Sequence, residues 1–342
     1  MDNYEDFIMN NSMCDFEQSL KWNNIKNNWK NEQVIIRQNN EIKLTANVLI
    51  RKLPIFGVMM YVPRGPIGEI HNIKLMEELT NELKKLAKKY KAFVVLMEPD
   101  IRYDNEEFKN IAEYLGYKIN SKSKNFTSSI QARYNLRLNL KNKTEDELLK
   151  SFNQKTRYNI KLAQKKGVVV KDVGIKGLDD FYELLKTTGQ RDKFIIRPKD
   201  YYANIMHEFK DTTILLAYYE DEPIAGIMVL SYGNKTWYLN GASGNNHRNT
   251  MPNYLLQWEA IKIAMNNNSI LYDFKGCSFK RNKPDGLYRF KKSFGTELVE
   301  LIGEVNLEIK PSRYHLFRMS KILYCNIRKI KHHIINYLRA NN

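Results

Sequence analysis

Cysteine is scarce in this 342-residue chain, which holds only Cys14, Cys277 and Cys325. The three lie far apart and form no Cys-x-x-Cys pair, so their spacing predicts neither a zinc site nor a disulfide framework and fits a reducing compartment. The six histidines show no His-Glu-x-x-His or His-x-His spacing. We therefore expect no bound metal.

Long apolar runs are missing as well. No stretch of about 18 apolar residues occurs, so no segment is expected to span a bilayer. The residues from Met1 to Asp6 carry acids where a signal peptide has a basic segment followed by an apolar one. These absences predict a cytoplasmic protein that is not exported.

Acidic residues are outnumbered, since 38 Asp and Glu face 55 Lys and Arg and leave a net charge of +17. Such an excess favours a polyanionic partner: nucleic acid, a nucleotide-linked substrate or an anionic membrane surface. A basic composition inherited from a biased genome is the alternative, because the chain is also rich in Lys, Asn and Ile.

Apolar patterns predict three strands, a helix, a strand and a helix in the first half. Their ranges are 33–37, 42–53, 58–62, 75–86, 92–97 and 105–115. The second half repeats this order without obvious sequence identity. Its ranges are 213–219, 224–232, 235–240, 253–265, 270–274 and 287–292. The order is that of an acetyltransferase-like (GNAT) unit, so we predict an α/β (α+β) fold of tandem GNAT domains.

The duplication also predicts the domain limits. The first GNAT-like domain is expected at 1–140, with the C-terminal segment returning to it, and the second at 141–310. A basic amphipathic helical tail is expected at 311–342. From residue 310 onward the chain has eight Lys or Arg, three His and no acid. This tail either docks on the anionic inner membrane leaflet or packs its apolar side on the body of the protein.

A basic stretch, 118–166, lies between the two halves. Its core, 144–166, is predicted as a helix, because Thr144 and Glu147 form a capping box and Gly167 ends the pattern. The polar side of this helix carries Lys155, Arg157, Lys161, Lys165 and Lys166. Cations of one sign suit contact with a phosphate backbone, and a merely solvated helix face is the alternative.

Glycine is missing where an acyl-CoA site needs it. Only glycines let backbone amides close around a pyrophosphate between a strand and its helix. The second-half loop, 241–253, has no glycine after Gly244, and Pro252 lacks a donor; the first-half loop, 64–68, is no better. No CoA or other cofactor is expected.

Five short strings occur in order over roughly residues 15 to 310. They are Ile25-Lys26-Asn27-Asn28-Trp29, Tyr61-Val62-Pro63-Arg64-Gly65-Pro66, Lys155-Thr156-Arg157-Tyr158-Asn159-Ile160, Tyr272-Asp273-Phe274 and Gly286-Leu287-Tyr288-Arg289-Phe290-Lys291-Lys292-Ser293-Phe294-Gly295. Together they resemble the Fem family of non-ribosomal peptidyltransferases, in its compact subtype without a long helical arm.

The resemblance implies an enzyme that takes alanine, serine or glycine from aminoacyl-tRNA. The acceptor would be the side-chain amine of the third residue of a muramyl pentapeptide, carried on UDP or as lipid II, so that the product is a peptidoglycan interpeptide bridge. Two rivals stay open: a transferase acting on another amine, and an RNA-binding protein without catalysis.

The resemblance also assigns residues. For the acceptor it implies Lys26, Arg64, Arg197 and Tyr201, with Glu98 orienting or deprotonating the amine. A guanidinium and an ammonium suit a diphosphate. The resemblance further implies Lys291 and Phe290 as catalytic residues. Phe93 and Asn240 stand at the positions of family tyrosines. The residues expected to contact tRNA are Lys155, Arg157, Lys161, Lys165 and Lys292.

Lys291 would stabilise the oxyanion that forms when the acceptor amine attacks the ester. No protein nucleophile is needed for this reaction. Ser243 and His247 share one loop without a strand-turn-helix elbow, which argues against a serine hydrolase.

Overall fold

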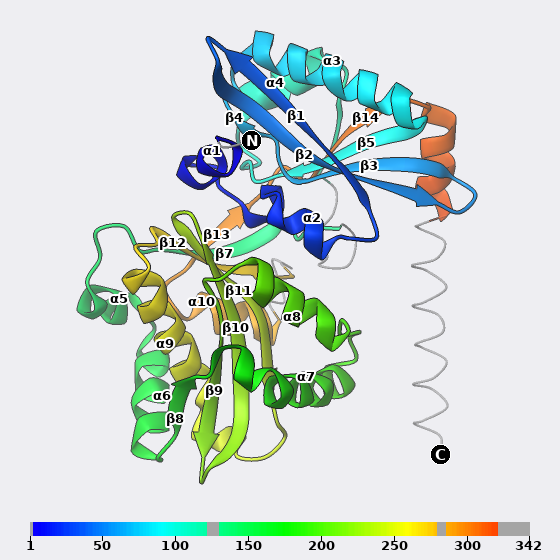
Figure 1. Cartoon of the computed structure of the whole chain (residues 1–342). Helices are drawn as coiled ribbons and strands as arrows, with labels where there is room; N and C mark the ends of the chain where they lie inside the picture. The colour runs from blue at the N-terminus through cyan, green and yellow to red at the C-terminus, as the bar shows by residue number, and fades with distance from the viewer. Residues whose placement is uncertain (1–2, 122–129, 279–284, 321–342) are drawn as a thin grey trace.

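The computed structural model describes residues 3–121, 130–278 and 285–320. Two seven-stranded sheets lie one above the other in Figure 1, each with its own helices. The first has the order β1-β2-β3-β5-β14-β6, with β4 paired to β2. Its strands are β1 (Lys30–Gln38), β2 (Glu41–Leu53), β3 (Gly57–Arg64), β4 (Ile67–Gly68), β5 (Ala92–Pro99), β6 (Lys118–Asn120) and β14 (Glu304–Glu308).

Helices α3 (Ile73–Tyr90) and α4 (Glu106–Tyr114) cover the outer face of this sheet (Figure 1). The leucines of α3 recur at helical spacing and are buried against the strands, as their periodicity predicts. Three short elements lie on the side that faces the second sheet. They are α1 (Tyr4–Asn10), the 3-10 turn η1 (Phe16–Gln18) and α2 (Lys21–Ile25).

The second sheet has the order β13-β7-β12-β11-β10-β9-β8. Its strands are β7 (Tyr134–Asn139), β8 (Val169–Asp172), β9 (Thr212–Tyr219), β10 (Glu222–Tyr232), β11 (Lys235–Ser243), β12 (Leu271–Gly276) and β13 (Glu297–Glu300). Both sheets have one parallel pair among antiparallel ones, β3 with β5 and β11 with β12. The mixed α/β class and the repeated strand order that the sequence predicts are confirmed.

Helices cover both faces of the second sheet. One side holds α5 (Glu145–Ser151), α6 (Gln154–Lys165) and α9 (Pro252–Asn266), and the other holds α7 (Leu178–Asp192) and α8 (Lys199–Glu208) (Figure 1). Alternate residues of β9 explain the division, because Leu215 packs with the α9 side and Leu216 with the α7 side. The short elements η2 (Gly174–Gly177), η3 (Arg248–Thr250) and α10 (Gly286–Lys292) complete this half.

The predicted single helix over 144–166 is wrong in one respect. The capping box of Thr144 and Glu147 is present, but the chain leaves the helix at Phe152 and re-enters it after Asn153. Phe152 is buried against Trp258 and Phe294, and the backbone N–H of Asn153 donates to the carbonyl of Ser293. Tertiary packing therefore overrides the local helical pattern.

The ends of the chain meet the first sheet. β14 follows the second half in sequence, yet it pairs with β5 and β6. After it, residues 311–320 form a helix whose Tyr314 is buried. The rest of the predicted tail lies outside the described residues. Within the described ranges, no helix combines the length and the apolar character needed to cross a membrane.

Candidate functional site

A pocket of about 310 Å³ opens between the two halves. The first half contributes η1 and α2, and the second contributes the loop before α8, α8 itself, β11 and the end of β12. The lining residues are Phe16, Glu17, Trp22, Phe194, Ile195, Ile196, Arg197, Tyr201, Tyr202, Ile205, Leu239, Asn240 and Lys275. Its walls are thus aromatic and apolar, with a few charged groups.

Three of the predicted acceptor residues meet here: Arg197 and Tyr201 line the pocket, and Lys26 lies against its wall. The Lys26 ammonium lies 4.7 Å from the Trp22 ring centre and 5.4 Å from that of Tyr201. The Arg197 guanidinium lies 5.6 Å from the same Tyr201 ring. Lys26 follows the last residue of α2, whereas Arg197 lies in the loop before α8 and Tyr201 in the first turn of α8, so the site needs both halves.

The two cations rest on aromatic faces and not on carboxylates. Among the described residues, neither Lys26 nor Arg197 has a carboxylate within ion-pair distance; burial lowers the pKa of Lys26, and nearby Glu17 only partly opposes this. Cation–π contact stabilises a cation while leaving its N–H donors available. This arrangement suits an anion, such as a diphosphate, that brings the missing negative charge.

Lys275 is a third cation at the pocket, and the sequence patterns did not indicate it. A register shift in β12 between Asp273 and Gly276 gives Lys275 a left-handed φ of 59°. Its ammonium lies 3.3 Å from a Glu17 carboxylate oxygen and 5.0 Å from the Phe16 ring centre. The bulge thus turns a residue of the second sheet toward the first half.

Glu98 and Arg64 lie beside each other inside the first half, because β3 and β5 pair in parallel register at their ends. The Tyr61 hydroxyl donates to Glu98 Oε2 over 2.8 Å, and the Gln131 backbone N–H donates to both carboxylate oxygens. Burial raises the pKa of Glu98 to about 7 despite these donors. Glu98 does not line the pocket, but Gln131 links it to Glu17, which does.

Arg64 is buried as well, and Nη2 donates to the Ala132 carbonyl. Burial alone would lower its pKa, but surrounding carboxylates, led by Asp100 and Asp15, raise it. The pKa of Asp15 is raised as well, to about 7, by burial and by the charge of Glu17. Arg64 therefore neutralises buried carboxylates, and it is not exposed to the pocket.

Lys291 lies directly behind the β12 bulge. Its buried ammonium donates to the carbonyls of Phe274, over 2.6 Å, and Gly276, over 2.8 Å, the residues that flank Lys275. Burial lowers its pKa to about 8. Lys291 does not line the pocket, and neighbouring Phe290 packs on Tyr254 and Phe294. Two of the three ammonium protons therefore hold the backbone at the site.

The predicted tRNA-contacting residues do not converge on this pocket. Lys155, Lys161 and Lys165 are exposed on α6, on the other side of the second sheet from α7 and α8. Arg157 is half-buried and donates to the carbonyls at the end of α5. Lys292 is exposed on α10 and donates to the Thr296 carbonyl.

Four other residues singled out from the sequence have separate places. Asn240 lines the pocket, whereas Phe93 is buried in the first half against Phe317. The Ser243 hydroxyl accepts from Arg191, and the His247 ring packs on Tyr219. The described residues include no group of three His, Cys, Asp or Glu arranged to hold a metal ion.

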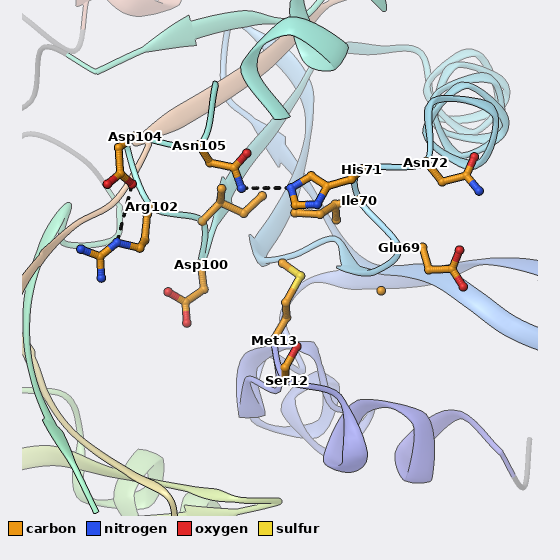
Figure 2. Close-up of a pocket in the computed structure, with 12 residues that line it drawn as sticks. Ser12, Met13, Glu69, Ile70, His71, Asn72, Asp100, Arg102, Asp104 and Asn105 are labelled. Atoms are coloured by element: carbon orange, nitrogen blue, oxygen red, sulfur yellow. Dashed lines mark hydrogen bonds and ion pairs between the residues drawn. The ribbon is translucent and has the colours of Figure 1, made fainter. Parts of the chain in front are cut away.

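A larger cavity, of about 720 Å³, lies at the starts of α3 and α4 (Figure 2). Asn105 and His71 lie 3.0 Å apart across it, and Arg102 lies 3.6 Å from Asp104. None of the predicted site residues lines it. Its inner wall includes Asp100, whose carboxylate binds Arg137 of the second sheet over 2.6 Å.

Comparison with known proteins agrees with this architecture. The FemAB family model matches residues 1–220 and 216–321. A lipid II:glycine glycyltransferase of Staphylococcus epidermidis is 28% identical, with 93% of this chain and 94% of that protein covered. The enzyme of the same name from Staphylococcus aureus MRSA252 is 26% identical over the same shares.

Solved structures show the same fold. The crystal structure of FemX superposes with a TM-score of 0.86 at 25% identity, covering 93% of this chain and 98% of that one. A tandem GNAT protein from the clavulanic acid biosynthesis pathway superposes with a TM-score of 0.52 at 11% identity, covering 82% and 83%. The tandem GNAT fold predicted from the sequence is therefore confirmed.

Proposed function

Because the chain belongs to the FemAB family, we propose that it is an aminoacyltransferase that adds glycine to lipid II and thereby builds peptidoglycan interpeptide bridges. The relatives named lipid II:glycine glycyltransferase support both the donor residue and the acceptor, since they align with almost the whole chain. Glycine is accordingly preferred over the alanine or serine that the resemblance leaves open, and the lipid-linked precursor over the UDP-linked one.

One observation carries the proposal: Lys26 and Arg197 both lie over the Tyr201 ring, and neither forms an ion pair with a carboxylate among the described residues. Lipid II contains a diphosphate between its sugar and its lipid, and charge-assisted hydrogen bonds from an ammonium and a guanidinium suit that group. The aromatic and apolar walls exclude water from the bound precursor. The peptide would extend from there toward Lys275 and Glu17.

The donor would be glycyl-tRNA. The neutral amine of the third peptide residue attacks the ester carbonyl, a C–N bond forms, and the C–O bond to the terminal ribose breaks. The attacking amine loses a proton, and the ribose oxygen gains one. Negative charge develops on the carbonyl oxygen meanwhile, so a fixed cation nearby lowers the barrier.

Lys291 is the proposed cation for this step. An ammonium has three protons, and the carbonyls of Phe274 and Gly276 take two of them. The third would stabilise the oxyanion, while the first two keep Lys275 in its left-handed turn. In this proposal Phe290 fixes α10 by packing on Tyr254 and Phe294, and it therefore acts as a positioning residue.

The experiment combines the purified full chain with glycyl-, alanyl- and seryl-tRNA and either lipid II or the UDP-linked precursor. We expect mass spectrometry to show addition of glycine to lipid II. Lys26→Ala and Arg197→Ala should raise KM for the precursor more than they lower kcat. Transfer without any muramyl peptide would instead favour another amine acceptor. Binding of tRNA without transfer to any acceptor would favour a non-catalytic RNA-binding protein.

The cytoplasmic face of the plasma membrane is the proposed location, because charged tRNA and a membrane-held precursor meet there. The exposed lysines of α6 and Lys292 are proposed to contact the tRNA backbone. Their position away from the acceptor pocket is compatible with a long substrate that reaches the site with its terminal nucleotides only.

A further inference from the structure

The turn between β2 and β3 carries an isoleucine that the rest of the protein does not cover. Ile55 is 92% exposed. The Phe56 N–H donates to the Pro54 carbonyl over 2.8 Å, which makes a tight turn with Ile55 at its centre and a φ of 70° there. Glycine or asparagine suits such a conformation far better than a β-branched residue. Backbone preference therefore does not explain the isoleucine.

This turn projects beyond the edge of the sheet. The pairing of β1 with β2 begins at Lys30 opposite Ile50, so the hairpin from Arg51 to Val58 extends past the end of β1. Arg51 and Lys52 are exposed on it. No Asp or Glu occurs anywhere between residues 42 and 68. The tip of the projecting hairpin is therefore an exposed apolar side chain, and the charged residues behind it are all basic.

The helix at 311–320 continues the same surface. Phe317 packs on Phe56, with ring centres 5.4 Å apart, and the Arg313 guanidinium lies against Gly57. Figure 1 shows this helix, in orange-red, beside the turn of the β2–β3 hairpin. Leu316 and Met319 are 57% and 56% exposed on the side of the helix away from buried Tyr314. The chain has no acid from residue 309 to its end.

We propose that this end of the first sheet, called the hairpin face below, docks on an anionic lipid bilayer with Ile55 inserted among the acyl chains. It comprises Ile55 at the tip, Arg51 and Lys52 on opposite faces of β2 behind the tip, and Arg313, Leu316 and Met319 of the adjacent helix. Apolar residues surrounded by cations suit a negatively charged lipid surface better than a neutral protein surface. Lys and Arg near such a surface raise binding by roughly five-fold each.

The hairpin face lies on the side of the first half that carries Lys26. The Arg51 guanidinium lies 5.2 Å from the Trp29 ring centre. Burial is the main cause that lowers the pKa of Lys26, and the charge of Arg51 lowers it further. Docking through this face therefore brings Lys26 close to the headgroup layer, where the diphosphate of a lipid-linked precursor lies. The inference deepens the proposed function but does not depend on transfer activity.

The test measures sedimentation of the full chain with phosphatidylcholine vesicles, with and without phosphatidylglycerol. We expect binding to the anionic vesicles that weakens with salt, and at least a roughly ten-fold loss in Ile55→Asp, because an exposed apolar side chain no longer enters the bilayer. Lys52→Ser/Arg313→Ser should weaken binding and flatten its salt dependence. Ile175→Asp, at an exposed isoleucine of the second half, is the matched control and should bind as the unmodified chain does.

Three outcomes would overturn the inference. In the first outcome, Ile55→Asp binds vesicles normally and Leu316→Asp/Met319→Asp does not, which assigns docking to the C-terminal helix without the hairpin. Equal binding to neutral and anionic vesicles would remove the role of charge. A dimer in sedimentation velocity that dissociates in Ile55→Asp would assign the face to a second copy of the chain.

A parallel assay separates this inference from the proposed function. Glycyl transfer to a water-soluble, short-chain analogue of lipid II should be unchanged in Ile55→Asp, whereas transfer to lipid II in vesicles should show a raised KM. If the unmodified chain bound anionic vesicles but transferred nothing to either acceptor, the docking face would stand and the proposed function would fall.

Discussion

Lys291 is buried in the described structure, and its charge depends on pH within the range where enzymes are assayed. Burial lowers its pKa to about 8. If the ammonium stabilises the oxyanion, the transfer rate at saturating substrate should fall as pH rises through about 8. Lys291→Met should lower kcat by about a hundred- to thousand-fold, the usual cost of one such group. Rapid-quench measurement across pH checks both expectations.

A purely structural role of Lys291 would look different. The same ammonium holds the carbonyls on either side of Lys275, so its loss could act through the shape of the pocket. Lys291→Arg keeps a positive charge at alkaline pH, so the fall of the transfer rate should move to higher pH in this variant. A Lys291→Met variant with normal kcat, raised KM for the precursor and a lower unfolding temperature would contradict the catalytic assignment.

Glu98 makes the stability of the first half depend on pH. Its folded-state pKa of about 7 lies above the ordinary value of 4.5, so the folded protein binds its proton more tightly than the unfolded chain does. Its contribution is fully present below pH 4.5 and is lost as pH rises toward 7. Glu98→Gln should therefore raise stability at neutral pH by on the order of 1 kcal/mol and flatten this slope.

Urea unfolding at several pH values measures this effect. Asp15 shifts in the same direction, so some pH dependence should remain in the Glu98→Gln protein. The matched control is Glu78→Gln on the exposed side of α3. A Glu98→Gln protein that is less stable than the unmodified chain at neutral pH would show that the donors Tyr61 and Gln131 need a carboxylate.

At the level of elements, α6 presents exposed lysines on the far side of the second sheet from α7 and α8. Its exposed Lys155, Lys161 and Lys165 are proposed to contact phosphates, and each such contact adds roughly 0.7 to 0.9 to the slope of log affinity against log salt. The triple alanine variant should therefore bind tRNA more weakly and lose roughly 2 to 3 units of this slope. Filter binding over a salt series measures it.

The control for α6 is a triple alanine variant of α3, at Lys84, Lys85 and Lys88, which are equally exposed but lie on the first half. It removes the same net charge from another helix. Equal losses in the two variants would show that only the overall charge of the protein matters. An unchanged slope in the α6 variant would leave these lysines as a solvated helix face.

Elements with strong local patterns could be predicted from the sequence, and features set by distant partners could not. The apolar run at 92–97 and the leucines of α3 identify β5 and that helix without further information. The break at Phe152 depends on Trp258 and Phe294, which lie far along the chain. No local pattern indicates such packing, so the sequence predicts a continuous helix.

The candidate site shows the same division. Lys26, Arg197 and Tyr201 carry recognisable strings, and they meet at one pocket. Lys275 reaches that pocket only because β12 has a bulge, for which the neighbouring residues give no turn signal. Burial of Lys291 behind the bulge likewise depends on how α10 packs. The predicted limits of the two domains stay a prediction.

At the scale of the whole molecule, a buried guanidinium connects the two sheets. Arg137 of β7 donates to Asp273 of β12 over 2.9 Å and to Asp100 at the end of β5 over 2.6 Å. All three side chains are largely buried. Burial raises the pKa of Asp100, but the charges of Arg137 and Lys235 outweigh this and hold it well below its usual range. These two ion pairs, together with the packing of Phe16 on Phe209 and Trp237, connect the two halves that carry Lys26 and Arg197.

Arg137→Met should destabilise the protein by about 3 to 5 kcal/mol, because two buried carboxylates lose their shared cation. Arg102→Ala is the matched control: its 2.8 Å pair with Glu297 also connects the halves but is exposed, so about 0 to 1 kcal/mol is expected. The loss of stability in Arg137→Met should shrink as pH is lowered toward the ordinary pKa of aspartate, because protonation removes the carboxylate charge. Adding Asp273→Asn to Arg137→Met should restore part of the lost stability at neutral pH. Thermal and urea unfolding measure both effects, together with KM for the precursor. Equal losses in Arg137→Met and Arg102→Ala would mean that apolar packing alone fixes the two halves.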